Sequence, residues 1–238
     1  MATGRSGTLL SGRPVFEAVI LESSLLSAAG GTADPYGSTR LAPLINTIRD
    51  FVVHEVHTSM PARSLRLLTD RSFTAALLLG AGAVPGARGP DHVVRRPLRQ
   101  AGAELVRFGS TLDQLPRLVR EADRLVRVPL GLPPLTSDQL ALIDREMEAF
   151  SRVLASGRDR FLRELRPGRS PEDHALNLWR LHSVHGVPLN IAMTWYREHA
   201  LPVSLRHCVA VDFAARSSRT MVTSAGTVHR PGTASTAR

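Results

Sequence analysis

Two segments of the chain repeat one histidine spacing and supply its best candidates for chemistry. Residues 53–57 read VHEVH and residues 181–185 read LHSVH. Two helical residues that are three apart lie within about 6 Å of each other, so each segment would place two imidazoles side by side. Imidazole titrates near neutral pH and binds zinc or iron, so such pairs could transfer protons or hold a metal. The pairs are His54 with His57 and His182 with His185.

The first pair has a carboxylate within reach. Asp50 precedes His54 by one helical turn, so Asp50, His54 and His57 form a weak candidate metal site with oxygen and nitrogen ligands. The alternative is that all three side chains face solvent, opposite the apolar stripe of their helix. The Glu-x-x-His motif of helical di-iron proteins does not occur in the sequence. The sequence therefore favours the solvent-facing interpretation and predicts no bound cofactor.

The second pair lies in a strongly apolar helix that should begin after Ser170, where an N-cap serine, a proline and two acids follow in order. His174 and His185 fall on one face of this helix, and His182 lies beside Trp179. This placement predicts a pocket lined by His174 and Trp179, with His182 and His185 as candidate chemical groups. The alternative is that His185 is a core histidine bonded to a backbone carbonyl.

The elements that position these residues all show helical periodicity. Apolar stripes with a period of 3.6 residues predict helices over about 40–59 and 73–79 and two helices from Pro97 onward, the second of which covers 115–126. Thr136 and Gln139 form a capping box before a long helix of about 28 residues. The stripe over 115–126 leaves Arg117, Arg120, Arg124 and Arg127 facing water. We therefore predict an all-α fold, an irregular bundle of about six to eight helices with disordered termini.

The expected domain organisation is simple. Residues 1–13 and 217–238 are rich in Gly, Ser and Thr and are predicted to be disordered tails. Residues 14–216 are predicted to form a single helical domain, with an internal flexible loop at about 80–96 that contains several glycines. The apolar seam from Leu140 to Phe161 would serve either as an intrachain core or as the interface of a homodimer.

Composition limits the possible partners. The net charge is +9, but all 30 basic residues are arginine, and the Arg, Ala, Gly and Pro content is that of an actinobacterial-type, GC-rich genome. No basic run is interleaved with stacking aromatics, so we predict a solvated arginine-rich surface and no sequence-specific nucleic-acid binding. Cys208 is the single cysteine, and neither a leader nor an apolar run of membrane-spanning length occurs. These features predict a cytoplasmic protein without a membrane partner.

A family resemblance enters at residues 172–190, which read EDHALNLWRLHSVHGVPLN. An apolar helix with two histidines followed by Asn190 resembles the helical C-terminal region of thiopeptide-type and lantibiotic dehydratase-like peptide-modifying proteins. A Pro-Tyr-Gly turn at 34–37, an apolar helix at 72–79 and a proline-rich lead into the long helix extend the similarity over residues 34–200. The chain departs from the family pattern at Ile191, which stands where the family has arginine. The resemblance implies that His182, His185 and Asn190 are catalytic.

Three functions follow as hypotheses. The leading one is an accessory or tailoring protein of peptide natural-product biosynthesis, which would bind a precursor peptide or another pathway protein. The alternative is a non-catalytic α-helical module for ligand binding or protein interaction. The third is a metal-dependent helical oxidase that would use the histidine pairs.

Overall fold

The computed structural model describes residues 34–37, 41–56, 60–86, 91–165, 169–203 and 206. The chain divides into two compact units, Met1–Ser156 and Gly157–Arg238. Every regular element in the described ranges is helical, and none is a strand, which confirms the all-α prediction. The α-helices α2 to α8 agree with an expected total of about six to eight. The predicted tails lie outside the described residues.

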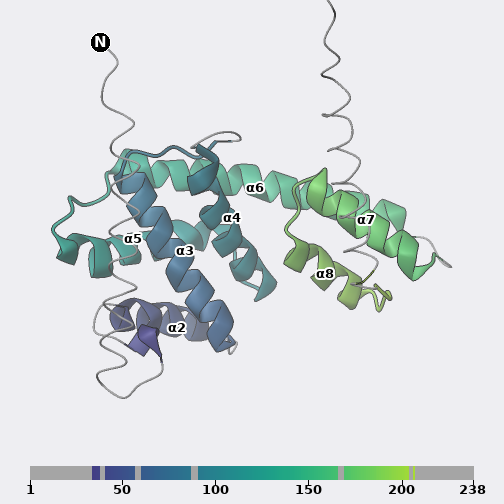
Figure 1. The fold of residues 1–238 in the computed structure, drawn as a ribbon, viewed down its shortest axis with the longest axis horizontal. Helices are drawn as coiled ribbons and strands as arrows, with labels where there is room; N and C mark the ends of the chain where they lie inside the picture. The colour runs from purple at the N-terminus through teal and green to yellow at the C-terminus, as the bar shows by residue number, and fades with distance from the viewer. Residues whose placement is uncertain are drawn as a thin grey trace, which may run out of the picture. The chain divides into compact units, whose positions relative to one another are not determined.

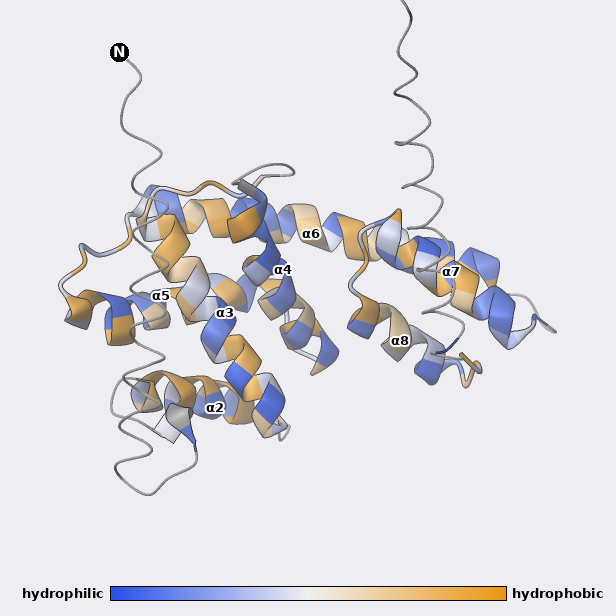
Figure 2. Ribbon diagram, viewed as in Figure 1, coloured by the Kyte–Doolittle hydropathy of each residue, from blue (hydrophilic) through white to orange (hydrophobic). Residues whose placement is uncertain are grey.

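The first unit is built around helix α3 (Ala62–Gly80), which packs against α2 (Ala42–Val56), α4 (Asp91–Arg107) and α5 (Leu115–Ala122) (Figure 1). Two 3-10 turns, η1 (Pro35–Gly37) and η2 (Leu112–Gln114), precede α2 and α5. Apolar side chains at helical spacing on each helix point inward, and orange and blue residues alternate along the helices in Figure 2. The apolar stripe predicted for this segment is buried at Leu41, just before α2, and at Leu44, Ile45, Ile48 and Val52.

Two helices are longer than the sequence predicted. The apolar segment at 73–79 is the second half of α3, which begins at Ala62. Helix α4 begins at Asp91, so residues 91–96 of the loop predicted at about 80–96 are helical, and Pro97 lies inside the helix instead of starting it. A proline within a helix removes one backbone hydrogen bond. Burial of Val94 and Leu98 on either side of Pro97 offsets that loss and keeps the helix continuous.

The long helix agrees with its prediction. Helix α6 spans Ser137–Glu164, which is 28 residues. It begins at the predicted capping box, in which the Gln139 backbone N–H donates to the Thr136 hydroxyl (3.3 Å) and the Gln139 side chain accepts from the Thr136 backbone (2.9 Å). In the first unit its buried face carries Ile143, Met147 and Phe150. Residues 157–164 of the same helix belong to the second unit.

The second unit consists of the end of α6, helix α7 (Pro171–Ser183) and helix α8 (Leu189–Glu198). Its core is aromatic: the Phe161 ring lies 5.0 Å from Tyr196 and 5.8 Å from Trp195, centroid to centroid. Gly157 allows a close approach, because a Cβ atom there would collide with the Val187 side chain. The N-cap predicted at Ser170 is present, with Pro171 in the first turn of α7, and the structure adds a capping box between Ser170 and Asp173. Within the described ranges, no helix is both long and apolar enough to cross a bilayer.

A polar cluster fastens turn η1 to helix α3. The Tyr36 hydroxyl donates to the Asp70 carboxylate (2.8 Å), and Arg66 pairs with Asp34 (3.0 Å). The Arg66 guanidinium also lies over the Tyr36 ring, 5.4 Å from its centroid. Burial raises the pKa of Asp70, although the hydrogen bond from Tyr36 and the positive charge of Arg71 act against this shift. Burial and the nearby Asp70 raise the pKa of Tyr36 as well.

Replacement of Asp70 by asparagine should therefore stabilise the protein at pH 7. A carboxylate whose pKa is raised on folding carries a cost that is present above the folded pKa and is relieved as the pH falls. The asparagine side chain would keep an acceptor for Tyr36 without a buried charge, so Asp70→Asn should raise the Tm at pH 7. The gain should shrink as the pH falls toward 3.8, the ordinary pKa of aspartate. A lower Tm at pH 7, measured by circular dichroism, would show that the ionised form is needed.

Candidate nucleic-acid interface

Helix α4 carries three arginines near its start, and two of them share one carboxylate from α6. The Nε atoms of Arg95 and Arg99 both donate to Oε1 of Glu146, at 2.9 and 2.6 Å. Glu146 is 8% exposed, whereas Arg95 and Arg99 are 24% and 19% exposed. Arg96 is exposed and makes no ion pair among the described residues. One carboxylate cannot neutralise three guanidinium groups, so this segment of α4 has a local excess of positive charge.

The packing of α4 against α6 holds these arginines in place. Gly102 allows the two helices to approach closely, because a Cβ atom there would lie 3.1 Å from the Met147 sulfur and 2.9 Å from Leu112. The Arg99 guanidinium lies over the Phe150 ring, 5.2 Å from its centroid. Its Nη2 atom is buried without a hydrogen-bond partner. A guanidinium fixed in this way loses little conformational freedom when it binds a phosphate or carboxylate.

A second line of arginines runs along α5. Arg117 and Arg120 on α5, and Arg124 directly after its end, are exposed, as the sequence predicted. Arg124 pairs with Glu121 (2.7 Å), while Arg120 makes no ion pair among the described residues. Both α4 and α5 belong to the first unit and pack against each other. The first unit therefore presents arginines from two neighbouring helices.

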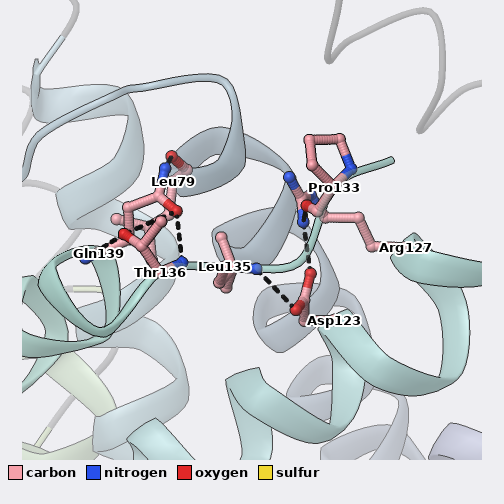
Figure 3. Close-up of polar contacts among 7 residues, drawn as sticks. All are labelled: Leu79, Asp123, Arg127, Pro133, Leu135, Thr136 and Gln139. Atoms are coloured by element: carbon pink, nitrogen blue, oxygen red, sulfur yellow. Dashed lines mark hydrogen bonds and ion pairs between the residues drawn. The ribbon is translucent and has the colours of Figure 1, made fainter. Parts of the chain in front are cut away.

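The prediction that Arg127 faces water is wrong. Helix α5 continues into a π-helical turn, η3 (Asp123–Arg127), and Arg127 is 3% exposed. A π-helical turn accommodates one extra residue and so changes which side chains face inward. The Arg127 Nη1 atom donates to Asp123 Oδ1 at 2.5 Å and to the Pro133 carbonyl (Figure 3). The Leu135 backbone N–H donates to the other oxygen of Asp123 (2.9 Å).

The buried ion pair between Arg127 and Asp123 holds the segment that connects α5 to α6 against the rest of the first unit. After η3 the chain passes through the 3-10 turn η4 (Val128–Leu130) and enters α6, where the Gln139 side chain donates to the Leu79 carbonyl at the end of α3 (2.7 Å) (Figure 3). Gly80 follows Leu79, and a Cβ atom there would collide with the Arg127 guanidinium. The network thus holds the end of α3, the turn η3 and the start of α6 together.

A small hollow lies between α2 and α5. Its volume is about 300 Å³, and its lining combines two carboxylates, an imidazole, a guanidinium, a hydroxyl and apolar groups: Thr47, Asp50, Phe51, His54, Arg117, Leu118 and Glu121. Asp50 and His54, two of the weak metal candidates, are exposed here, as the solvent-facing interpretation predicted. The third candidate, His57, lies outside the described residues. Among the residues that the structure places, no group of three or more metal-ligating side chains occurs.

Three of the predicted site residues in the second unit make hydrogen bonds with the backbone, namely His174, His182 and Asn190. His174 is buried, and its Nδ1 atom lies 2.9 Å from the Pro202 carbonyl. His182 is exposed, with Nδ1 3.0 Å from the Val187 carbonyl. His185 and Trp179 are half-buried, and the Asn190 side chain accepts from the Ile191 N–H (3.1 Å). A catalytic role for His182, His185 and Asn190, and a pocket at Trp179 and His174, stay predictions.

Comparison with known proteins assigns the chain to a family. The model of class II (A) tRNA synthetases matches residues 29–230. The alanine–tRNA ligase of Chlorobaculum tepidum is 26% identical over 193 residues, which are 75% of this chain and 21% of that protein. That of Mycobacterium tuberculosis is 28% identical over 180 residues, 71% of this chain and 19% of the ligase. That of Mycobacterium avium is 30% identical over 146 residues, 58% and 16% of the two chains. The chain thus spans about a fifth of the length of these relatives.

These matches overturn several predictions. The resemblance to thiopeptide-type and lantibiotic dehydratase-like proteins is wrong, because it rested on a helix with two histidines and on turns that many helical proteins contain. The predicted role in peptide natural-product biosynthesis is therefore wrong, and so is the predicted precursor-peptide partner. The interaction-module and oxidase alternatives are not supported either. The prediction that the chain has no nucleic-acid partner is contradicted as well, since the relatives are named as tRNA ligases. The chain belongs to the class II (A) tRNA synthetase family.

Proposed function

We propose that this chain binds tRNA, with the arginines near the start of α4 as its principal contact. The relatives are named as ligases that act on alanine and tRNA, and the matched region includes all of α4 and α5. The proposal concerns tRNA binding alone, because the chain spans only about a fifth of those ligases. A tRNA partner also implies a cytoplasmic location.

The observation that carries the proposal is the grouping of Arg95, Arg96 and Arg99 on α4 with a single paired carboxylate, Glu146. Affinity for RNA comes mainly from contacts between basic side chains and backbone phosphates. Arginine suits this contact because its planar guanidinium can donate two parallel hydrogen bonds to one phosphate. Glu146 restrains two of the three guanidiniums, and Arg96, which is exposed, is available to a phosphate. The arginines on α5 would extend the contact along a second helix.

Arg96→Ala should weaken the binding of an alanine tRNA transcript and reduce its salt dependence. Loss of one phosphate contact lowers the slope of log K against log salt concentration by about 1. Fluorescence anisotropy titrations at several KCl concentrations measure both quantities. Arg96→Glu should weaken binding further, because it places a negative charge against the phosphates.

The matched control is Arg152→Ala. Arg152 is an exposed arginine of the first unit, but it lies on α6 and pairs with Glu148 (2.6 Å). Its loss should leave both the affinity and the salt slope within the error of the wild-type values. Equal effects of Arg96→Ala and Arg152→Ala would show that the contact is diffuse, and would contradict the assignment to α4.

A further inference from the structure

The hollow between α2 and α5 contains an arginine that lies on an aromatic ring. The Arg117 guanidinium lies over the Phe51 ring, 5.3 Å from its centroid. Phe51 is buried and Arg117 is exposed, so the guanidinium forms the outer layer of this stack. Guanidinium planes and aromatic rings are the surfaces on which proteins stack unpaired RNA bases. The stack therefore offers a preformed platform for a flat ligand.

Two carboxylates border the same hollow, and their oxygens are available as hydrogen-bond acceptors for a ligand. Asp50 is exposed and makes no hydrogen bond or ion pair among the described residues. Glu121 receives both of its hydrogen bonds from Arg124 on one oxygen, Oε2, at 3.0 and 2.7 Å. Ionised carboxylates can only accept, so a ligand that contacts them must present N–H or O–H donors.

The size of the hollow also restricts its ligand. Ligand pockets in proteins range from about 300 to 1,000 Å³. The hollow has a volume of about 300 Å³, at the lower end of that range. A single planar ring system fits this space, whereas a stem of paired RNA does not.

We propose that this hollow binds an unstacked guanine base of RNA, an inference that rests on the proposed tRNA binding. Guanine carries two neighbouring donors on one edge, its ring N1–H and its exocyclic N2–H, and these match the two oxygens of one carboxylate. Asp50 is the acceptor for this edge, and the base stacks on Arg117. Glu121, on the opposite helix, faces the hollow from α5. Uracil has one ring N–H and lacks the neighbouring donor, so it cannot make the paired contact.

Single-stranded oligonucleotides test this site apart from the phosphate contacts. The full chain is titrated with a uridine nonamer, with the same nonamer carrying one central guanosine, and with one carrying central inosine, which lacks the exocyclic amine. All three carry the same phosphates, so the electrostatic contribution cancels in the comparison. The guanosine nonamer should bind about tenfold more tightly than the other two. Asp50→Asn should reduce this preference to about twofold or less.

The control variant is Asp144→Asn, which removes the charge of another exposed aspartate of the first unit and should keep the preference. Equal affinity for the guanosine and uridine nonamers would overturn the guanine site while leaving RNA binding intact. A preference that survives Asp50→Asn would overturn it too, because guanine would then be recognised elsewhere. Failure of every RNA to bind, alanine tRNA included, would instead overturn the proposed function together with this inference.

Discussion

Replacement of Arg127 by methionine should lower the free energy of unfolding by about 3 to 5 kcal/mol. The variant keeps an unbranched side chain of similar length but leaves the Asp123 carboxylate buried with a single donor, the Leu135 N–H. A charge buried without its partner costs several kcal/mol because the protein no longer compensates for its lost hydration. Urea denaturation followed by circular dichroism measures this change.

The control for Arg127→Met is Arg124→Met, which breaks the exposed pair with Glu121 one turn away. An exposed ion pair contributes less than about 1 kcal/mol, so this variant should unfold near the wild-type urea concentration. The double variant Asp123→Leu with Arg127→Met should recover much of the lost stability, because it removes both buried charges together. If Arg127→Met cost no more than Arg124→Met, the guanidinium would not be buried in solution.

The elements that could be predicted from the sequence are those set by local patterns. The apolar stripe of α2, the capping box of α6 and the N-cap of α7 depend on residues within a few turns, and the structure confirms all three. The start of α4 could not be predicted in this way. A proline usually marks the beginning of a helix, and the burial of Val94 and Leu98 that overrides Pro97 depends on distant parts of the chain.

The candidate interface could not be predicted from the sequence either, because it depends on contacts between distant parts of the chain. Arg95 and Arg99 lie 51 and 47 residues from Glu146, so no local spacing relates them. The absence of lysine made the arginines look like a consequence of base composition. For Arg127 the local pattern gave a wrong prediction. A helical wheel at 100° per residue places its side chain in water, whereas the π-helical turn places it in the protein interior. The histidines were prominent in the sequence, but His182 and His174 contact backbone carbonyls in the structure.

The core beneath α4 should be equally sensitive to substitution. Phe150→Ala is expected to cost about 3 to 5 kcal/mol, from lost burial of the ring and from the cavity that it leaves. Phe150 is fully buried, and it lies beside Met147 in the seam where Gly102 brings α4 against α6. Urea denaturation measures the cost. Val53→Ala, which shortens a side chain that is 51% exposed on α2, should change the stability by no more than about 0.5 kcal/mol.

The same residue links stability to the proposed function. Phe150 supports the Arg99 guanidinium from beneath, so Phe150→Ala should also release Arg99 and weaken tRNA binding under conditions in which the variant is still folded. Phe150→Leu fills most of the space but offers no ring face to the guanidinium, because a cation is attracted to the π-electrons of an aromatic ring. It should therefore recover much of the stability and less of the tRNA affinity. If Phe150→Leu restored both equally, the ring would serve the core alone, and Arg99 would owe its position to Glu146.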